Sequence, residues 1–381
     1  MEIIITHKSA LEYWRLQRRS PNMVKTNGAE KLRRKNLPKT LPRITNICRR
    51  MPTELSYPIN LMVGSKNAQW KSKTVRQRLY TGRIPDGGFV GIGSEMAVSA
   101  PHFCFFQMAG ELPLIKLIEL GFEICGTYSL PPISSHGNEY SAKQDNGQSN
   151  DDDIPEKLLR ANKEFINNPK LYSLLKETAD RALRGEEEDI ENRPLYGLPQ
   201  LTNTKAIKAF TAKMEGVKGK KKAARALRYI ADGSASPMVT ILFMLLTLPY
   251  KLGGYGLPAP ELNRRIDIVS PTKDRPGKSY YVCDLFWPEE GLAVEYDSDT
   301  YHSGADRIAR DSKRRFDLSA LGISIITVTN KQIRNAAEFE GVAKLIAQKL
   351  NKQLQYKNPQ FQKAKRELRR LLLLHTPDDA R

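Results

Sequence analysis

The sequence contains no apolar run long enough to cross a bilayer. Its 381 residues include no uninterrupted apolar stretch of 18 or more, and the longest one, around Val239–Leu248, is too short to span a membrane. The N-terminal segment MEIIITHKSALEYW also lacks the basic region and the cleavage-like site of a secretory signal. We therefore expect a cytoplasmic location and no membrane partner.

Cysteine is scarce, and the cysteines are scattered along the chain. There is no Cys-x-x-Cys pair and no Cys/His cluster, which argues against a structural zinc site and against a disulfide framework. A reducing compartment suits such isolated thiols best. The four cysteines are Cys48, Cys104, Cys125 and Cys283.

Acidic residues are too few to balance the basic ones. Lys and Arg total 61 against 42 Asp and Glu, which gives a net charge of +19. This excess favours a polyanionic partner, with nucleic acid first and an anionic membrane second. Residues 1–50 carry 13 basic and 3 acidic residues, whereas residues 101–200 carry 10 basic and 17 acidic. Such asymmetry is typical of a chain built from separate modules.

The length predicts two or three domains, and the composition suggests where they divide. Short strands are expected at 59–64, 88–93 and 96–101, and a helical hairpin over 101–126. The fold class is therefore α/β, organised as a multidomain α+β chain. Its expected parts are a small α+β domain with a basic arm (1–130), a polar linker (131–155), a helical region (156–235), an α/β domain (236–350) and a basic helical tail (351–381).

Two basic stretches each have two interpretations. The first is the arm at 18–50, and the second is the helix start KGKKKAARALR at 218–228. Either one can be a solvated charged surface or a set of contacts to nucleic-acid phosphates. The candidate phosphate contacts in the second stretch are Lys218, Lys220, Lys221 and Lys222.

Residues 236–350 have the most informative pattern. The order of apolar periodicities predicts α-β-β-β-α-β-α, with strands at 264–270, 280–288, 292–298 and 324–329 and helices at 237–249, 307–321 and 336–350. The last β-α-β part should form a parallel crossover.

Carboxylates interrupt two of these apolar strands. Asp284 lies in YYVCDLFW, and Glu295 and Asp297 share one face of LAVEYDS. If the two strands form a hairpin, Asp284 and Glu295 meet on one face. Buried carboxylates need compensation, and a Mg²⁺ or Mn²⁺ ion provides it with one or two carboxylates and several waters. The alternative is solvated edge strands, or pairing with Arg264, Arg265 or Arg307.

The segment from Asp284 to SIITVT resembles the core of the PD-(D/E)XK nuclease superfamily, and most of all its Vsr-like (very-short-patch-repair) branch. The matching pattern consists of Asp284, Glu295-Tyr296-Asp297, His302, Asp311 with Arg314 or Arg315, and Gly322 before the last strand. The resemblance implies a restriction-endonuclease-like core (α-β-β-β-α-β) and a metal-dependent DNA endonuclease. Asp284 and Glu295 would hold the metal, with Asp297 in support. His302 would be the general acid or base. Arg307, Arg310, Lys313 and Arg314 would contact phosphate.

The layout of the chain has a looser resemblance to proteins associated with AbiEi-type abortive-infection antitoxins. This implies a phage-defence or toxin–antitoxin setting, with a toxin or antitoxin encoded by a neighbouring gene as a partner.

Three positions depart from the nuclease pattern. Asp297 stands where the superfamily usually has a Lys, Val239 stands where a Glu is expected, and Ser298 replaces a Gly. A catalytically inactive nuclease-fold regulator that binds DNA, or an antitoxin-like protein, is therefore the alternative function.

Overall fold

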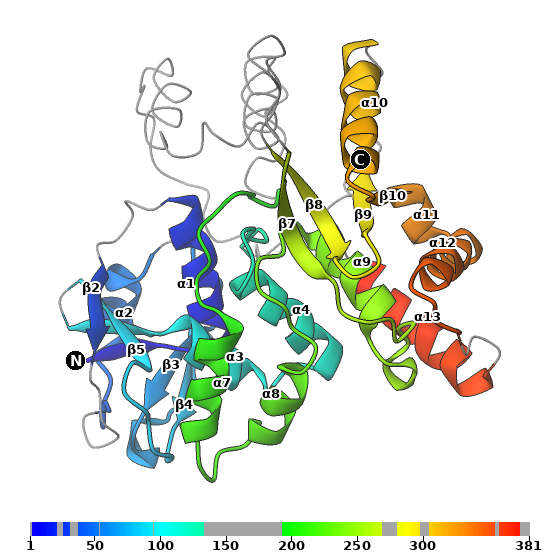
Figure 1. Ribbon diagram of the computed structural model, residues 1–381. Coiled ribbons are helices and arrows are strands. Elements are labelled where there is room, and N and C mark those ends of the chain that lie inside the picture. The colour runs from blue at the N-terminus through cyan, green and yellow to red at the C-terminus, as the bar shows by residue number, and fades with distance from the viewer. Residues whose placement is uncertain are drawn as a thin grey trace. The chain divides into compact units, whose positions relative to one another are not determined.

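The computed structural model describes nine stretches of the chain (Figure 1). Of these, the strand at 26–30 and the helix start at 305–308 are described by their backbone alone. The expected linker beyond residue 132 and the expected helices before residue 193 lie outside the described residues. The described stretches are 2–20, 26–30, 37–52, 54–93, 95–132, 193–268, 280–297, 305–354 and 358–373.

The chain is a mixed α/β protein that divides into two compact units. Unit 1 consists of residues 1–100 and 129–199, and unit 2 of residues 101–128 and 200–381. Each unit contains one mixed β-sheet. Among the residues that the structure describes, no helix is both long and apolar enough to cross a membrane.

Unit 1 is built on a six-stranded sheet. Its strand order is β2-β5-β6-β1-β3-β4, and the β1–β6 and β3–β4 pairs are parallel while the others are antiparallel. The expected strands at 59–64, 88–93 and 96–101 are confirmed. The strands are β1 (Ile3–Ile5), β2 (Thr26–Glu30), β3 (Ile59–Val63), β4 (Val75–Leu79), β5 (Phe89–Ile92) and β6 (Met96–Ser99).

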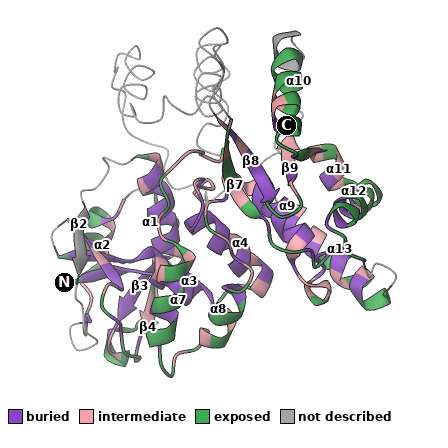
Figure 2. Cartoon of the chain, viewed as in Figure 1, coloured by how far each residue is buried: buried purple, intermediate pink, exposed green. Residues whose placement is uncertain are grey.

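The centre of this sheet is apolar on both faces. All residues of β1 and β3 are buried, which matches their sequences III and INLMV, apolar except for Asn60. Figure 2 shows this burial along the strands. The described helices of unit 1 are α1 (His7–Arg19), most of which is buried, and the shorter α2 (Ile44–Arg50).

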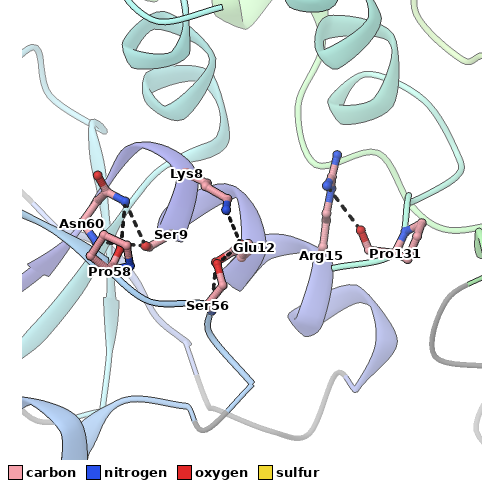
Figure 3. A network of polar contacts seen from close by, with 8 residues as sticks. All are labelled: Lys8, Ser9, Glu12, Arg15, Ser56, Pro58, Asn60 and Pro131. Atoms are coloured by element: carbon pink, nitrogen blue, oxygen red, sulfur yellow. Dashed lines mark hydrogen bonds and ion pairs between the residues drawn. The ribbon is translucent and has the colours of Figure 1, made fainter. Parts of the chain in front are cut away.

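A buried polar network fastens α1 to the segment that enters β3 (Figure 3). Glu12 is only 1% exposed, and it accepts hydrogen bonds from the Ser56 hydroxyl and, at 3.2 Å, from the Ser56 backbone N–H. Lys8 Nζ lies 3.6 Å from the same carboxylate. One turn earlier, Ser9 Oγ accepts from the Asn60 backbone N–H at 2.9 Å. These contacts satisfy a charge that would otherwise be costly to bury.

Unit 2 begins with a bundle of helices. The rings of Phe103 and Phe210 lie 5.3 Å apart, and those of Phe122 and Phe243 lie 5.1 Å apart. The Tyr128 hydroxyl forms a hydrogen bond with a threonine hydroxyl of the helix at 237–247. Because of these contacts, the hairpin at 101–124 groups with unit 2, so the expected domain 1–130 is divided between the two units. The helices are α3 (Pro101–Met108), α4 (Leu114–Ile124), α7 (Thr204–Lys213), α8 (Lys220–Ala226) and α9 (Pro237–Thr247).

The second sheet follows α9 and has the order β10-β9-β8-β7. β10 is parallel to β9 through the expected crossover, and the other pairs are antiparallel. The element order from α9 to β10 is therefore α-β-β-β-α-β. The strands are β7 (Glu261–Asp267), β8 (Tyr280–Trp287), β9 (Leu292–Asp297) and β10 (Ser324–Thr329), and the helices are α10 (Ala305–Ala320), α11 (Asn330–Arg334), α12 (Ala336–Lys349) and α13 (Pro359–Leu373).

The basic C-terminal helix α13 packs on the rest of unit 2. Phe361 meets the Tyr255 ring at 5.5 Å, and Lys365 forms a 2.7 Å ion pair with Glu340 of α12. Arg369 donates to the carbonyl groups of residues in α11 at 2.7 and 2.8 Å. The cations of α13 thus bind carbonyl groups at the end of α11 and a carboxylate of α12.

Candidate active site

Asp284 lies where strands β8 and β9 part. The described β8–β9 pairing runs from Trp287 opposite Leu292 to Leu285 opposite Val294, whereas β9 stays paired with β10 as far as Asp297. Beyond Val294, the backbone N–H of Tyr296 donates to Asp284 Oδ2 at 3.0 Å. A side-chain carboxylate therefore takes the place of a ladder acceptor, and this holds Asp284, which is 6% exposed, against β9.

Glu295 follows Val294 in β9, and an arginine from α10 binds its carboxylate. Arg314 Nη2 donates to Glu295 Oε1, and the same nitrogen donates to the Val282 carbonyl of β8 at 2.7 Å. The side chains of Arg314 and Glu295 are 22% and 15% exposed, so water screens the pair only partly. One guanidinium thus bridges the two strands beside the carboxylate.

Other contacts fix α10 over the sheet. The Tyr281 hydroxyl donates to Asp317 Oδ2 at 2.8 Å, and Leu318 is fully buried in a cluster with Tyr281 and Cys283. Burial and the Asp317 carboxylate raise the pKa of Tyr281 to about 12. Arg314, Asp317 and Leu318 are spaced three and four residues apart, which places them on one face of the helix.

Nearby charged groups of this site influence the pKa of the Cys283 thiol. The thiol is fully buried, and burial raises its pKa to about 11, with further raising by Glu295 and by Asp284. Arg314 acts in the opposite direction through its charge and a hydrogen bond. At neutral pH the thiol stays protonated, which does not suit a nucleophile.

The remaining predicted site residues lie in several places. Asp297 is half-buried at the end of β9, opposite Thr329 of β10. His302 lies outside the described residues, and Arg307 is described by its backbone alone. Arg310 and Lys313 are exposed on α10, where a phosphate can reach them.

Two of the three arginines named as alternative partners of the carboxylates pair elsewhere, while the side chain of the third, Arg307, lies outside the described residues. Arg264 contacts Glu261 at 3.3 Å, and Arg265 contacts Asp267 at 2.7 Å. The partner of Glu295 is Arg314, which the sequence pattern assigned to phosphate. The helical spacing from Arg314 to the buried Leu318 was the signal that could have placed it toward the sheet.

The lysine tract divides into anchored and exposed residues. Lys220 Nζ donates to the Ala212 carbonyl at 3.1 Å, and Lys222 Nζ donates to the Leu112 carbonyl at 2.8 Å. Lys218 and Lys221 are exposed. The anchored pair stabilises the helical bundle, and the exposed pair can meet an anion.

Val239 belongs to the core of unit 2. Ser236 caps α9 by accepting from the Val239 N–H at 3.1 Å, and Pro237 occupies the first helical position. The Val239 side chain is 3% exposed. The position at which the nuclease pattern has a Glu thus contributes packing and no charge.

Asp284 and Glu295 offer about the smallest number of carboxylates that can hold a hydrated divalent cation. Among the described residues there is no group of three or more His, Cys, Asp or Glu side chains that could hold a metal. Mg²⁺ needs only one or two carboxylates because it keeps several waters. Asp284 and Glu295 meet that requirement, with Arg314 competing for Glu295.

Comparison with known proteins finds a partial match to two uncharacterized mycobacterial proteins. No family model matches the chain, and no solved structure matches it significantly. The uncharacterized proteins MT2308 (strain CDC 1551 / Oshkosh) and Rv2248 (strain ATCC 25618 / H37Rv) of Mycobacterium tuberculosis are each 32% identical to the chain over 112 residues. The match covers 29% of this chain and 37% of each relative, so the chain spans little more than a third of their length.

Proposed function

We propose that residues 236–350 form a restriction-endonuclease-like domain that hydrolyses phosphodiester bonds in DNA with the help of Mg²⁺ or Mn²⁺. The α-β-β-β-α-β order from α9 to β10 supports this, as does the parallel pairing of the last strand with β9. The surplus of basic residues suits a polyanionic substrate.

The observation that carries the proposal is that Asp284 accepts from the backbone of β9 where two strands part, while Arg314 holds Glu295 of that same strand. The two carboxylates would hold the cation, which when bound polarises the phosphate and lowers the pKa of a water. Arg314 fixes the position of Glu295 and adds positive charge to a site that has Asp297 in place of the usual Lys. His302 remains the predicted general acid or base.

Exposed cations extend the proposed contact with DNA. Arg310 and Lys313 lie on α10, the helix that supplies Arg314, while Lys221 lies in the first turn of α8 and Lys218 just before that helix. Their contacts with phosphates would make binding fall steeply with salt. A cytoplasmic phage-defence or toxin–antitoxin role, with a partner encoded by a neighbouring gene, is the setting we propose.

The test is cleavage of supercoiled plasmid by the whole chain with Mg²⁺, with Mn²⁺ and with EDTA. We expect metal-dependent nicking that Asp284→Asn and Glu295→Gln abolish. Glu261→Gln, which removes an exposed carboxylate from β7 in the same sheet, should nick at the wild-type rate. Equal nicking by all four proteins would show that the activity does not come from this site.

The second candidate is a DNA-binding regulator that keeps the nuclease fold without cleavage. Two observations favour it: Arg314 already neutralises Glu295, and Val239 is an apolar core residue. Salt-sensitive binding of DNA, unchanged by Asp284→Asn and with no nicking under any metal condition, would select this candidate. Copurification of the neighbour-encoded protein would point to the antitoxin-like form.

A further inference from the structure

The connection between β3 and β4 in unit 1 is basic throughout. From Leu61 to Tyr80 the chain has five Lys or Arg residues and no Asp or Glu. Four of these cations are exposed, and they lie along the segment that leads into and begins β4, the edge strand of the sheet. The exposed members are Lys66, Lys71, Lys73 and Arg76.

Local hydrogen bonds hold this connection in one conformation. Ser65 Oγ accepts from the Asn67 N–H at 3.2 Å at the start of a short 3-10 turn, and Ala68 within the turn is 2% exposed. Ser72 Oγ accepts from the backbone N–H groups of Thr74 and Val75 at 3.1 and 3.2 Å. The basic side chains therefore extend from a backbone that is held in one conformation.

Trp70 lies in the middle of this connection and is partly open to solvent. The chain has three tryptophans. Trp14 and Trp287 are 8% and 3% exposed, and the indole N–H of each donates to a backbone carbonyl, at 2.8 and 2.9 Å. Trp70 is 36% exposed, and Lys71 follows it directly. An accessible indole among cations combines a stacking surface with phosphate contacts.

We propose that this surface, made of Lys66, Trp70, Lys71, Lys73 and Arg76, binds single-stranded nucleic acid. The lysines contact the phosphates and Trp70 stacks on a base. The strand must have unpaired bases, because bases inside a duplex already stack on one another and leave no free face for an indole. The proposal is independent of the proposed nuclease activity, since the surface lies in unit 1 and needs no metal.

The test is a fluorescence titration of the whole chain with oligo(dT) and with oligo(rU), in EDTA so that no strand is cut. Because Trp70 is the most exposed indole, binding should quench the red-shifted part of the emission. Trp70→Ala should weaken binding by about 5-fold or more, and Trp70→Phe should retain most of the affinity. Tighter binding of one oligonucleotide identifies DNA or RNA as the ligand.

Two double variants, each of which removes two positive charges, test the role of the cations. Lys71→Gln/Lys73→Gln should weaken binding and reduce the slope of log affinity against log salt by about 1.4, at roughly 0.7 for each phosphate contact of a single strand. Lys205→Gln/Lys208→Gln removes two exposed lysines from α7, to which no nucleic-acid contact is assigned, and should leave the slope nearly unchanged. Equal losses in both double variants, no effect of Trp70→Ala, or no binding by the wild type would each overturn the proposal.

Discussion

The ion pair between Arg314 and Glu295 gives the sharpest stability prediction. Arg314→Met keeps much of the apolar stem but leaves Glu295 and the Val282 carbonyl without the donor that the structure shows. Loss of one partner of a buried pair costs about 3–5 kcal/mol, while a fully exposed pair is worth about 0–1 kcal/mol. With side chains 22% and 15% exposed, we expect an intermediate cost of about 2–3 kcal/mol in the free energy of unfolding.

A double-mutant cycle isolates the interaction. Glu295→Gln should destabilise the protein less than Arg314→Met, because a neutral amide needs less compensation than a buried carboxylate. The double variant should be more stable than the sum of the two single losses predicts, by about 1–2 kcal/mol. The matched control is Arg315→Met, an exposed neighbour on the same helix, which should change stability by less than about 0.5 kcal/mol.

The assay must report on unit 2 separately from unit 1. Labelling with 5-fluorotryptophan gives one fluorine signal for each of the three tryptophans, and Trp287 lies in β8 itself. Urea titration of the Trp287 signal then measures unfolding around the site. A cost below about 0.5 kcal/mol for Arg314→Met, or additivity within about 0.5 kcal/mol in the cycle, would refute the reasoning.

Three further predictions concern buried groups. Glu12→Ala should lower the free energy of unfolding of unit 1 by about 2–3 kcal/mol, measured on the Trp14 signal, because it leaves both Ser56 donors without their acceptor. Burial raises the pKa of Glu12 from 4.5, so the folded state favours the protonated acid. The stability of the wild type relative to Glu12→Gln should therefore fall as the pH rises from about 4 toward the folded pKa. A difference in stability that does not change with pH would contradict this. Cys283 should resist alkylation by iodoacetamide at pH 8 in the native protein, while the half-buried Cys48 reacts first, as judged by peptide mass spectrometry.

The secondary structure of unit 2 follows closely from sequence periodicity. Strands such as YYVCDLFW and SIITVT are β-branched or aromatic runs bounded by turn residues, and the charged helix between Ala305 and Ala320 ends where Gly322 takes a positive φ. These are local signals. For this reason the expected order of elements from α9 to α12 matches the observed one, apart from the short α11.

Tertiary contacts could not be predicted from the same signals. The hairpin at 101–124 packs with helices about 100 residues later, through pairs such as Phe103–Phe210, and nothing in its own sequence shows this. Strand alternation predicts only the face of a side chain, whereas the register of the β8–β9 hairpin, with Leu285 opposite Val294, brings Asp284 next to β9. The helical spacing from Arg314 to the buried Leu318 could have placed Arg314 toward the sheet, but it does not identify Glu295 and the Val282 carbonyl as its partners.

The most direct test of the candidate site is Mn²⁺ binding by the whole chain, followed by electron paramagnetic resonance. We expect one site that Asp284→Asn and Glu295→Gln each weaken by about 10- to 100-fold, while Glu261→Gln leaves it unchanged. Arg314→Met should tighten it, because the cation that competes for Glu295 is gone. Mn²⁺ binding unaffected by Asp284→Asn and Glu295→Gln, or no binding to the wild type, would contradict the account.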